Sequence, residues 1–472
     1  MLLRYFYDEK LAQASYLVGC EATGEAIIID PARNIEQYLT AAEQQGMNII
    51  AAAETHIHAD FVSGTCELAV RTGATAYLSD EGDQDWKYQF LHKLNHVLVK
   101  DGDTFKIGGI TFEVIHTPGH TPEHISFIVT DGGATQPIGI FTGDFVFVGD
   151  IGRPDLLEKA AGIQNTADKG AKQMFHSLQR FLKLPDFVQV WPAHGAGSAC
   201  GKALGAVPST TVGYEKRANW AFNYNNEAEF VKELLSDQPE PPEYFAEMKR
   251  VNKEGPALLS ELSAIKRYSP SKKTIENWIN DNVPIIDVRS FHEFSRGHIP
   301  GTINIPYTLS FTNWAGWFLD YNQPFYVIAD ETEINGVIHD LHSIGIDTLK
   351  GYMHSDILER LEQDGLELQK YEQISSEELK NKMKNDEVYV IDVRNESEYK
   401  QGAIPGSRHI MLGTLRDRVH EIPTDKPVVT TCQAGGRAAI ATSILQAHGV
   451  SNVIHYRGGY NNWEKQHAST KC

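Results

Sequence analysis

The hydrophobic positions in the first half of the chain fall into short apolar runs separated by amphipathic stretches. Residues 34–46 place apolar side chains at the spacing of one helix face, which predicts an amphipathic helix. Residues 48–58, 111–121 and 137–147 each begin as an apolar run typical of a buried strand and carry His or Asp near the carboxyl end. Packing alone does not explain metal-type ligands at the ends of three hydrophobic strands. The pattern predicts a mixed α/β domain with a chemical site at its strand ends.

The second half of the chain repeats itself. Residues 284–306 match residues 389–410, and Asp287 pairs with Asp392 at an offset of 105 residues. One match at so long a period indicates two tandem copies of a domain rather than a solenoid. Each copy alternates apolar strands with helical stretches, which predicts a small doubly wound α/β sheet.

The chain length and the position of these patterns divide the molecule. A chain of 472 residues favours about three domains. We expect the first domain at residues 1–240 and a linker rich in Pro and charge at 241–263. The first copy of the repeat then covers 264–370 and the second 371–472. The expected fold class is a multidomain α/β protein.

Composition and charge narrow the class of protein. The hydrophobic fraction of 41% and the charged fraction of 22% are typical of a soluble globular protein. The net charge of −19 argues against nucleic acid or an anionic membrane as the main partner. We find no signal-peptide pattern and no apolar stretch of membrane-spanning length. Five scattered cysteines are too few for a disulfide framework and suit a reducing cytoplasm, where we expect the protein.

The segment 55–65, THIHADFVSGT, is the first candidate for chemistry. His56, His58 and Asp60 alternate within five residues, and two imidazoles with a carboxylate can converge on a divalent metal. The next position holds Phe61, which offers no ligand atom. The segment predicts a metal site with one complete position.

Further donors follow in separated blocks. HTPGHTPEH supplies His116, His120 and His124, FTGDF supplies Asp144, and WPAHG supplies His194. The order of these blocks over residues 10–220 resembles the metallo-β-lactamase superfamily, in particular its glyoxalase II and persulfide dioxygenase branch. The resemblance implies an αββα sandwich. Its ligand positions fall on His56, His58, Asp60, His120, Asp144 and His194. His116 and His124 are interpreted as neighbours of the ligand-bearing turn.

Phe61 departs from the pattern of the dinuclear hydrolases in this superfamily, in which the corresponding residue is a His that helps to hold a second metal. The persulfide dioxygenases of the superfamily hold one iron with two His and one Asp, here His56, His120 and Asp144. Such a face leaves open positions on Fe(II) for O2 and substrate. We expect one Fe(II) per chain, with zinc as the alternative or as an adventitious occupant. His58, Asp60 and His194 then either orient the ligands and bound water or belong to a second metal.

The second copy of the repeat carries a candidate nucleophile. An apolar strand ends at Thr431, a tight loop runs from Cys432 to Arg437, and a helix continues to Gly449. This Cys-x4-Arg loop, with the flanking segments over residues 371–466, resembles the active-site loop of the rhodaneses, which are sulfurtransferases. Backbone N–H groups at a helix start stabilise a thiolate, and paired glycines let the loop fold around it.

The resemblance assigns roles around this loop. Cys432 accepts a sulfane sulfur and becomes a persulfide, and Arg437 adds positive charge for the thiolate or for an anionic acceptor. The loop residues that form the cradle are Gln433, Ala434, Gly435 and Gly436. Asp392 and Arg394 are expected to form a structural pair that supports the loop.

The first copy of the repeat lacks the nucleophile. It keeps Asp287 and Arg289, but aligning Pro324 with Pro427 places Ala329 opposite Cys432. No cysteine occurs between Cys200 and Cys432. We interpret this copy as a degenerate rhodanese-like domain that spaces, docks or dimerises.

Together the domains resemble the persulfide dioxygenase–rhodanese fusions of bacterial sulfide detoxification. The resemblance implies an enzyme that uses a small-molecule persulfide and O2, forms sulfite, and transfers sulfane sulfur through Cys432 to give thiosulfate. Two alternatives remain: a glyoxalase II-like hydrolase of thioesters with two zincs, and a sulfur-relay protein whose metal domain is a binding module. The sequence leaves open whether the thiol is glutathione, coenzyme A, bacillithiol or cysteine. It also leaves open the role of Cys200, the route of sulfite and a homo-oligomeric state.

Overall fold

The computed structural model describes residues 1–161 and 166–468. The chain forms two compact units, of which the first contains Met1–Leu262 with Leu341–Gly345 and the second contains Ser263–Asp340 with the remainder. The boundary at Leu262 falls in the segment 241–263 for which we expect a linker. Cys472 lies outside the described residues. Among the helices of the described part of the chain, none has the length and apolar character needed to span a membrane.

Unit 1 is built on two six-stranded sheets, in each of which the strands follow chain order. The first sheet contains β1 (Leu2–Asp8), β2 (Gln13–Cys20), β3 (Glu25–Ile29), β4 (Asn48–Ala53), β5 (Thr75–Ser79) and β6 (His96–Val99). The second contains β7 (Thr104–Ile107), β8 (Ile110–His116), β9 (Ile125–Thr130), β10 (Gly139–Gly143), β11 (Gln189–Pro192) and β12 (Thr210–Thr211). Strands β3 to β6 run parallel, as do β10 and β11, whereas β7 to β10 are antiparallel.

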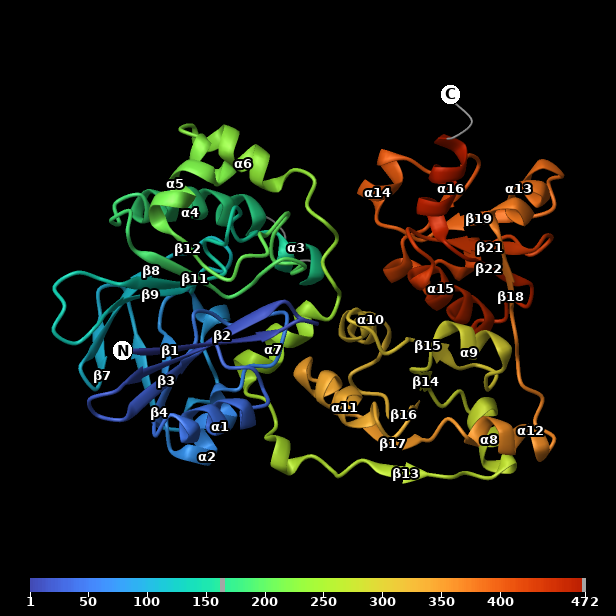
Figure 1. The fold of residues 1–472 in the computed structure, drawn as a ribbon, viewed down its shortest axis with the longest axis horizontal. Helices are drawn as coiled ribbons and strands as arrows, with labels where there is room; N and C mark the ends of the chain where they lie inside the picture. The colour runs from blue at the N-terminus through green and yellow to red at the C-terminus, as the bar shows by residue number, and fades with distance from the viewer. Residues whose placement is uncertain (162–165, 469–472) are drawn as a thin grey trace. The chain divides into compact units, whose positions relative to one another are not determined.

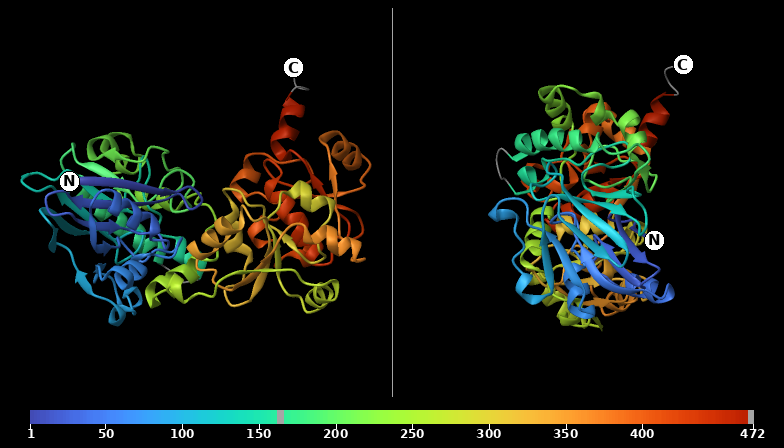
Figure 2. Two further views of the ribbon diagram at one scale, coloured as in Figure 1. Left: turned by 60° about the horizontal axis from the view of Figure 1, so that its bottom comes forward. Right: turned by 90° about the vertical axis from the view of Figure 1, so that its left-hand side faces the viewer.

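Helices cover the outer faces of both sheets, which gives four layers (Figure 1). The helices of unit 1 are α1 (Glu36–Gln44), α2 (Thr65–Thr72), α3 (Leu156–Ala161), α4 (Thr166–Phe181), α5 (Val212–Ala218), α6 (Glu227–Leu235) and α7 (Phe245–Glu254), with short 3-10 turns η1 (Gln84–Trp86), η2 (Leu91–Lys93), η3 (Trp220–Asn223) and η4 (Leu259–Glu261). Of these, α1 and α2 lie on one outer side of the sandwich and α4, α5 and α6 on the other (Figure 1). Ile27 and Phe112 share the core between the sheets. Tyr38 of α1 packs in a second core and Phe181 of α4 in a third. The predicted sandwich class is confirmed, and the right-hand view of Figure 2 shows its layers from another side.

Unit 2 contains two five-stranded parallel sheets with the same topology. The first has the order β13 (Lys266–Tyr268), β17 (Leu349–Met353), β16 (Phe325–Ile328), β14 (Ile285–Asp287) and β15 (Ile303–Asn304). The second has the order β18 (Glu372–Ile374), β22 (Val453–Tyr456), β21 (Val428–Thr431), β19 (Tyr389–Asp392) and β20 (Arg408–His409). The identical strand order is what the tandem repeat in the sequence predicts.

Helices connect these parallel strands, as parallel pairing requires. The first repeat has α8 (Lys272–Asn280), α9 (Phe291–Arg296), α10 (Phe311–Phe318), α11 (Ile334–Ser343) and α12 (Ile357–Gln363). The second has α13 (Ser376–Lys384), α14 (Glu396–Gln401), α15 (Gly436–Ala447) and α16 (Gly459–Ala468), with 3-10 turns η5 (Leu412–Thr414) and η6 (Val419–Glu421). Ile275 and Ile328 lie in the core of the first repeat, and Val429 and Ile454 in that of the second.

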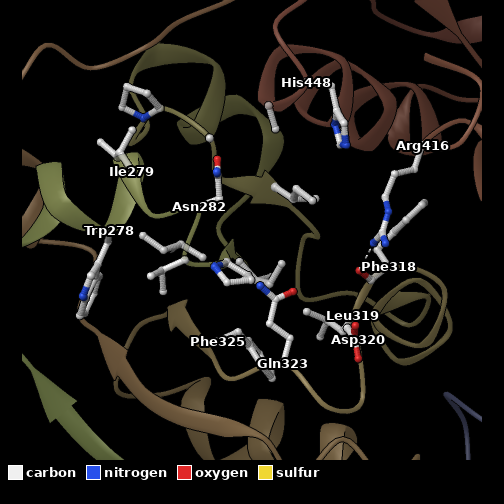
Figure 3. A pocket seen from close by; sticks show the side chains of 18 residues that line it. Trp278, Ile279, Asn282, Phe318, Leu319, Asp320, Gln323, Phe325, Arg416 and His448 are labelled. Atoms are coloured by element: carbon white, nitrogen blue, oxygen red, sulfur yellow. Dashed lines mark hydrogen bonds between the residues drawn. The ribbon is translucent and has the colours of Figure 1, made fainter. Parts of the chain in front are cut away.

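A cavity of about 350 Å³ lies between the two repeats of unit 2. Figure 3 shows Trp278 on one side of it and Arg416 and His448 on another. Arg416 donates to the carbonyl oxygen of Phe318 at 3.2 Å. His448 caps the carboxyl end of α15, the opposite end from the Cys432 loop. We therefore assign the cavity no part in chemistry at Cys432.

Candidate metal centre and sulfur-carrying loop

Three buried donors come together where strands of unit 1 end. His56 follows β4, His120 follows β8, and Asp144 directly follows β10. Their ligand atoms lie within 4.8 Å of one another. The close approach depends on Gly143, because a Cβ there would lie 2.5 Å from Thr55 Oγ1. The structure thus brings together the three residues that the sequence resemblance assigns to one metal.

The donor atoms themselves fit a cation. Nε2 of His56 and both carboxylate oxygens of Asp144 are buried without a hydrogen-bond partner among the described residues. Nε2 of His120 lies 3.4 Å from Asp144 Oδ2. Because buried polar atoms in folded proteins are almost always paired, a set of unpaired nitrogen and oxygen atoms facing one point indicates a metal site.

The opposite nitrogen of each imidazole is held by an oxygen. Nδ1 of His120 donates to the carbonyl oxygen of Arg153 at 2.9 Å, and Nδ1 of His56 lies 3.0 Å from Thr55 Oγ1. A carbonyl only accepts, so Nδ1 of His120 carries the proton and Nε2 offers its lone pair. Burial lowers the pKa of both imidazoles, which keeps them in the neutral form that binds metals.

A second group of donors lies beside the first. The ligand atoms of Asp60, His194 and Cys200, all buried, also lie within 4.8 Å of one another. Nε2 of His194 lies 3.1 Å from Asp60 Oδ2 and 3.4 Å from Asp144 Oδ1. Burial raises the pKa of the Cys200 thiol to about 12. Cys200, whose role the sequence leaves open, thus lies next to Asp60 and His194.

His58 belongs to neither group of donors. Its Nε2 lies 3.1 Å from Asp30 Oδ1, and its ring packs on Phe61 with the ring centroids 4.4 Å apart. Burial disfavours the imidazolium, but the charge of Asp30 outweighs it and raises the pKa of His58 to about 9. Asp30 has a φ of +49° and also accepts from the backbone N–H of Thr55. A strained backbone that serves a ligand-bearing loop is typical of functional sites.

Sequence reasoning missed three residues that position the ligands. His124 accepts the backbone N–H of Asp144 at its Nε2, over 3.0 Å. Glu123 accepts the N–H of Ile57, between the two leading histidines, at 2.8 Å, and burial raises the pKa of its carboxyl to about 7. The third residue, Asn252, lies almost 200 residues downstream of the loop that it contacts. Only the proximity of His124 to His120 in the sequence offered a signal.

Asn252 of α7 binds the backbone of residues 55–65, the segment that carries His56 and is called the metal loop from here on, at three points. Its side-chain amide donates to the carbonyl oxygens of His58 (2.8 Å) and Phe61 (2.7 Å). Its side-chain oxygen accepts the N–H of Ser63 at 2.9 Å. The side chain is buried, so water cannot replace these bonds.

We expect Asn252→Ala to lower metal affinity about tenfold, because residues that orient a ligand loop typically contribute that much. The measurement is chelator competition, alongside thermal melting. Asn219→Ala is the matched control, since Asn219 is equally buried and donates to Asp150 O and Glu215 but not to the metal loop. Equal losses of metal affinity in the two variants would show that Asn252 acts only through general stability.

The loop that contains Cys432, the candidate sulfur carrier, follows β21 in the second repeat of unit 2. Cys432 is buried, and its Sγ accepts the N–H of Gly435 at 3.0 Å. Gly435 has a φ of +107°, which favours glycine, and α15 begins at the next residue. The loop therefore has the form of a backbone cradle around a thiol at the start of a helix.

Two arginines brace the cradle. Arg394 donates to both oxygens of Asp392 and to Gln433 Oε1 at 3.0 Å, so it ties the loop to β19. Arg437 forms a two-point ion pair with Glu398, at 2.6 Å for each contact. Its charge is thus partly compensated. In the first repeat, Arg289 and Asp287 keep the equivalent pair, and Ala329 follows β16 where Cys432 follows β21.

Comparisons with known proteins match a different family model to each of the two units. The model of the metallo-beta-lactamase superfamily matches residues 9–194, and that of the rhodanese-like domain matches residues 271–337 and 375–466. A crystal structure of a metallo-beta-lactamase from Staphylococcus aureus subsp. aureus COL shares 45% sequence identity, covers 75% of this chain and 99% of its own, and has a TM-score of 0.68. Persulfide dioxygenase ETHE1 of Bos taurus is 27% identical over 199 residues, which are 41% of this chain and 68% of that protein. Hydroxyacylglutathione hydrolase of Rhodospirillum rubrum is 34% identical over 181 residues, 38% of this chain and 60% of that protein.

Fold, donor groups and matches define a class: an enzyme with a metal-binding sandwich domain joined to rhodanese-like domains. The chain belongs to the metallo-β-lactamase superfamily and carries two rhodanese-like domains.

Proposed function

We propose that the protein oxidises low-molecular-weight persulfides at a single Fe(II) and transfers sulfane sulfur through Cys432. The observation that carries the proposal is the buried group of His56, His120 and Asp144 with its unpaired ligand atoms. It is a two-histidine, one-carboxylate set, which suits a non-heme iron that uses O2. The similarity to a persulfide dioxygenase and the cradle of Cys432 on the same chain support a sulfur substrate.

The net oxidation is RSSH + O2 + H2O → RSH + sulfite + 2 H⁺. Iron bound by the three residues would supply the O2-activating chemistry at the terminal sulfur. The chain's own residues hold the ligand set in place: Arg153 O fixes the tautomer of His120, and His124 fixes the backbone of Asp144. Asp60 and His194, whose side chains touch, are the polar groups that we assign to bind the reacting water.

The second reaction takes place at Cys432. Its thiolate attacks the outer sulfur of a second persulfide, the S–S bond breaks, and RS⁻ leaves and takes up a proton. Sulfite then attacks the outer sulfur of the Cys432 persulfide, which releases thiosulfate and restores the thiolate. No net oxidant is needed, because the sulfane sulfur moves between two nucleophiles. The N–H of Gly435 stabilises the negative charge on Cys432 in both steps.

The second group of donors favours one rival function. Asp60, His194 and Cys200 could hold a second metal next to the first, with Asp144 between them. A site with two zincs would suit hydrolysis of thioesters, and hydroxyacylglutathione hydrolase is a relative. Phe61 argues against this rival, because it removes the nitrogen ligand that the dinuclear hydrolases place there.

An oxygen-electrode assay of the iron-loaded protein tests the proposal. Persulfides of glutathione, coenzyme A, bacillithiol and cysteine serve as substrates, with sulfite and thiosulfate quantified and the metal content measured. We expect O2 uptake with one iron per chain and thiosulfate as the final product. Two zincs per chain, rapid thioester hydrolysis and no O2 uptake would establish the rival function instead.

A further inference from the structure

The degenerate repeat packs directly on the helix that follows the sulfur-carrying loop. Residues 438–446 of α15 are all buried, so the helix has no solvent face. The backbone N–H of Asn304, in β15 of the first repeat, donates to Ser443 Oγ of α15 at 3.0 Å. A helix buried all round needs a neighbour on each side, and the first repeat supplies one of them.

His455 of β22 links this packing to the cradle. Its Nε2 donates to the carbonyl oxygen of Gly435 at 2.9 Å, and the N–H of Gly435 donates to Cys432 Sγ at 3.0 Å. Gly435 O also accepts the helical N–H of Ala439. The residue that contacts the sulfur is thus held along the helix by Ala439 and from the side by His455.

Two aromatic rings fix the imidazole of His455. Phe291, the first residue of α9 in the first repeat, lies edge-to-face on it, with ring centroids 5.5 Å apart and planes at 79°. Tyr371, at the junction of the repeats, lies perpendicular to it at 6.1 Å and donates its hydroxyl to Phe291 O. Burial lowers the pKa of His455 to about 4, so the ring is neutral and its one proton lies on Nε2, facing Gly435 O.

We propose that the degenerate repeat positions the sulfur cradle, because its Phe291 fixes the imidazole of His455, which holds Gly435 with its N–H on Cys432. His455 is a positioning residue, since it touches neither substrate nor sulfur. The inference rests on the proposed function of Cys432 and gives the repeat that lost its cysteine a role in the chemistry of the other repeat.

The test measures the thiolate of Cys432 directly. The rate of its alkylation by iodoacetamide is followed from pH 5 to 10 by mass spectrometry of the Cys432 peptide in the full-length protein. We expect His455→Phe, which keeps a ring but loses the donor, to shift the rate–pH profile to higher pH and to slow alkylation at pH 7 about three- to tenfold. His455→Gln, which keeps a side-chain N–H, should restore most of the rate.

Phe291→Ala should move the profile in the same direction. Tyr326→Ala is the matched control, because Tyr326 is also a half-buried aromatic residue of the first repeat but stacks on Trp278, away from His455. If Phe291→Ala melts at the assay temperature, Phe291→Leu replaces it. A loosened loop alone would expose the thiol and speed alkylation, which is the opposite sign.

Unchanged profiles in His455→Phe would overturn the role of His455, and an unchanged profile in Phe291→Ala or Phe291→Leu would overturn that of the repeat. Faster alkylation in the His455 variant or in a Phe291 variant would assign the substituted residue a structural role only. The readout needs no substrate. A wild-type protein that transfers no sulfur would therefore refute the proposed function while leaving the alkylation result interpretable.

Discussion

Cys432→Ser is expected to abolish thiosulfate formation, while O2 uptake continues and sulfite accumulates in its place. Serine keeps the size of the side chain, but its hydroxyl does not ionise near neutral pH and cannot carry a sulfane sulfur as a persulfide. We expect at least about a thousandfold loss of sulfur transfer, the range seen when a covalent nucleophile is removed. The measurement is a paired assay of O2 uptake and of sulfite and thiosulfate by chromatography.

Cys20→Ser is the control for this prediction. Cys20 is also buried, and its Sγ accepts the N–H of Gly109, a bond that a serine hydroxyl can keep. We assign it no part in either reaction. If Cys432→Ser also stopped O2 uptake, the two reactions would not be separable. The hypothesis of a sulfur-relay protein whose metal domain is a binding module would then replace the dioxygenase proposal.

His120→Ala is expected to remove the metal and with it O2 uptake, by about a thousandfold or more, because one of three ligands is lost. Transfer of sulfane sulfur from a persulfide to added sulfite should continue, since Cys432 and its cradle belong to another unit. Metal analysis by plasma mass spectrometry and the two activity assays measure the outcome.

His116→Ala is the matched control, four residues upstream in the same segment. Its Nε2 donates to the carbonyl oxygen of Pro122 rather than facing the donor group. It should retain the metal and the uptake of O2. Retention of metal in His120→Ala, or its loss in His116→Ala, would contradict the ligand set.

Much of the fold could be predicted from local patterns. Residues 34–46 predict a helix, and α1 spans Glu36–Gln44. The apolar run before Cys432 predicts a strand that ends at Thr431, as β21 does, and the tandem match predicts two sheets with one topology. These features depend on the spacing of apolar residues and on turn residues, which operate over a few neighbouring positions. The His and Asp residues at strand ends likewise indicated a metal site, and the family resemblance then assigned His56, His120 and Asp144 to one metal.

The contacts that tune both sites depend on residues distant in the sequence. His58 has the same local spacing as His56, yet in the structure its Nε2 pairs with Asp30 and it joins neither donor group. Asn252 comes from a segment that reads as a charged linker, and it binds the metal loop through the backbone. His455 and Phe291 lie on different repeats, and their rings meet only because the two repeats pack against each other.

The sequence by itself indicated the tandem architecture, the candidate nucleophile Cys432 and the set of metal-type side chains, because residue type and short-range periodicity carry that information. Only the tertiary structure decided which of those side chains converge and which residues hold them. Hydrogen bonds to backbone atoms and edge-to-face ring contacts depend on the packing of distant elements. They leave no periodic signal along the chain.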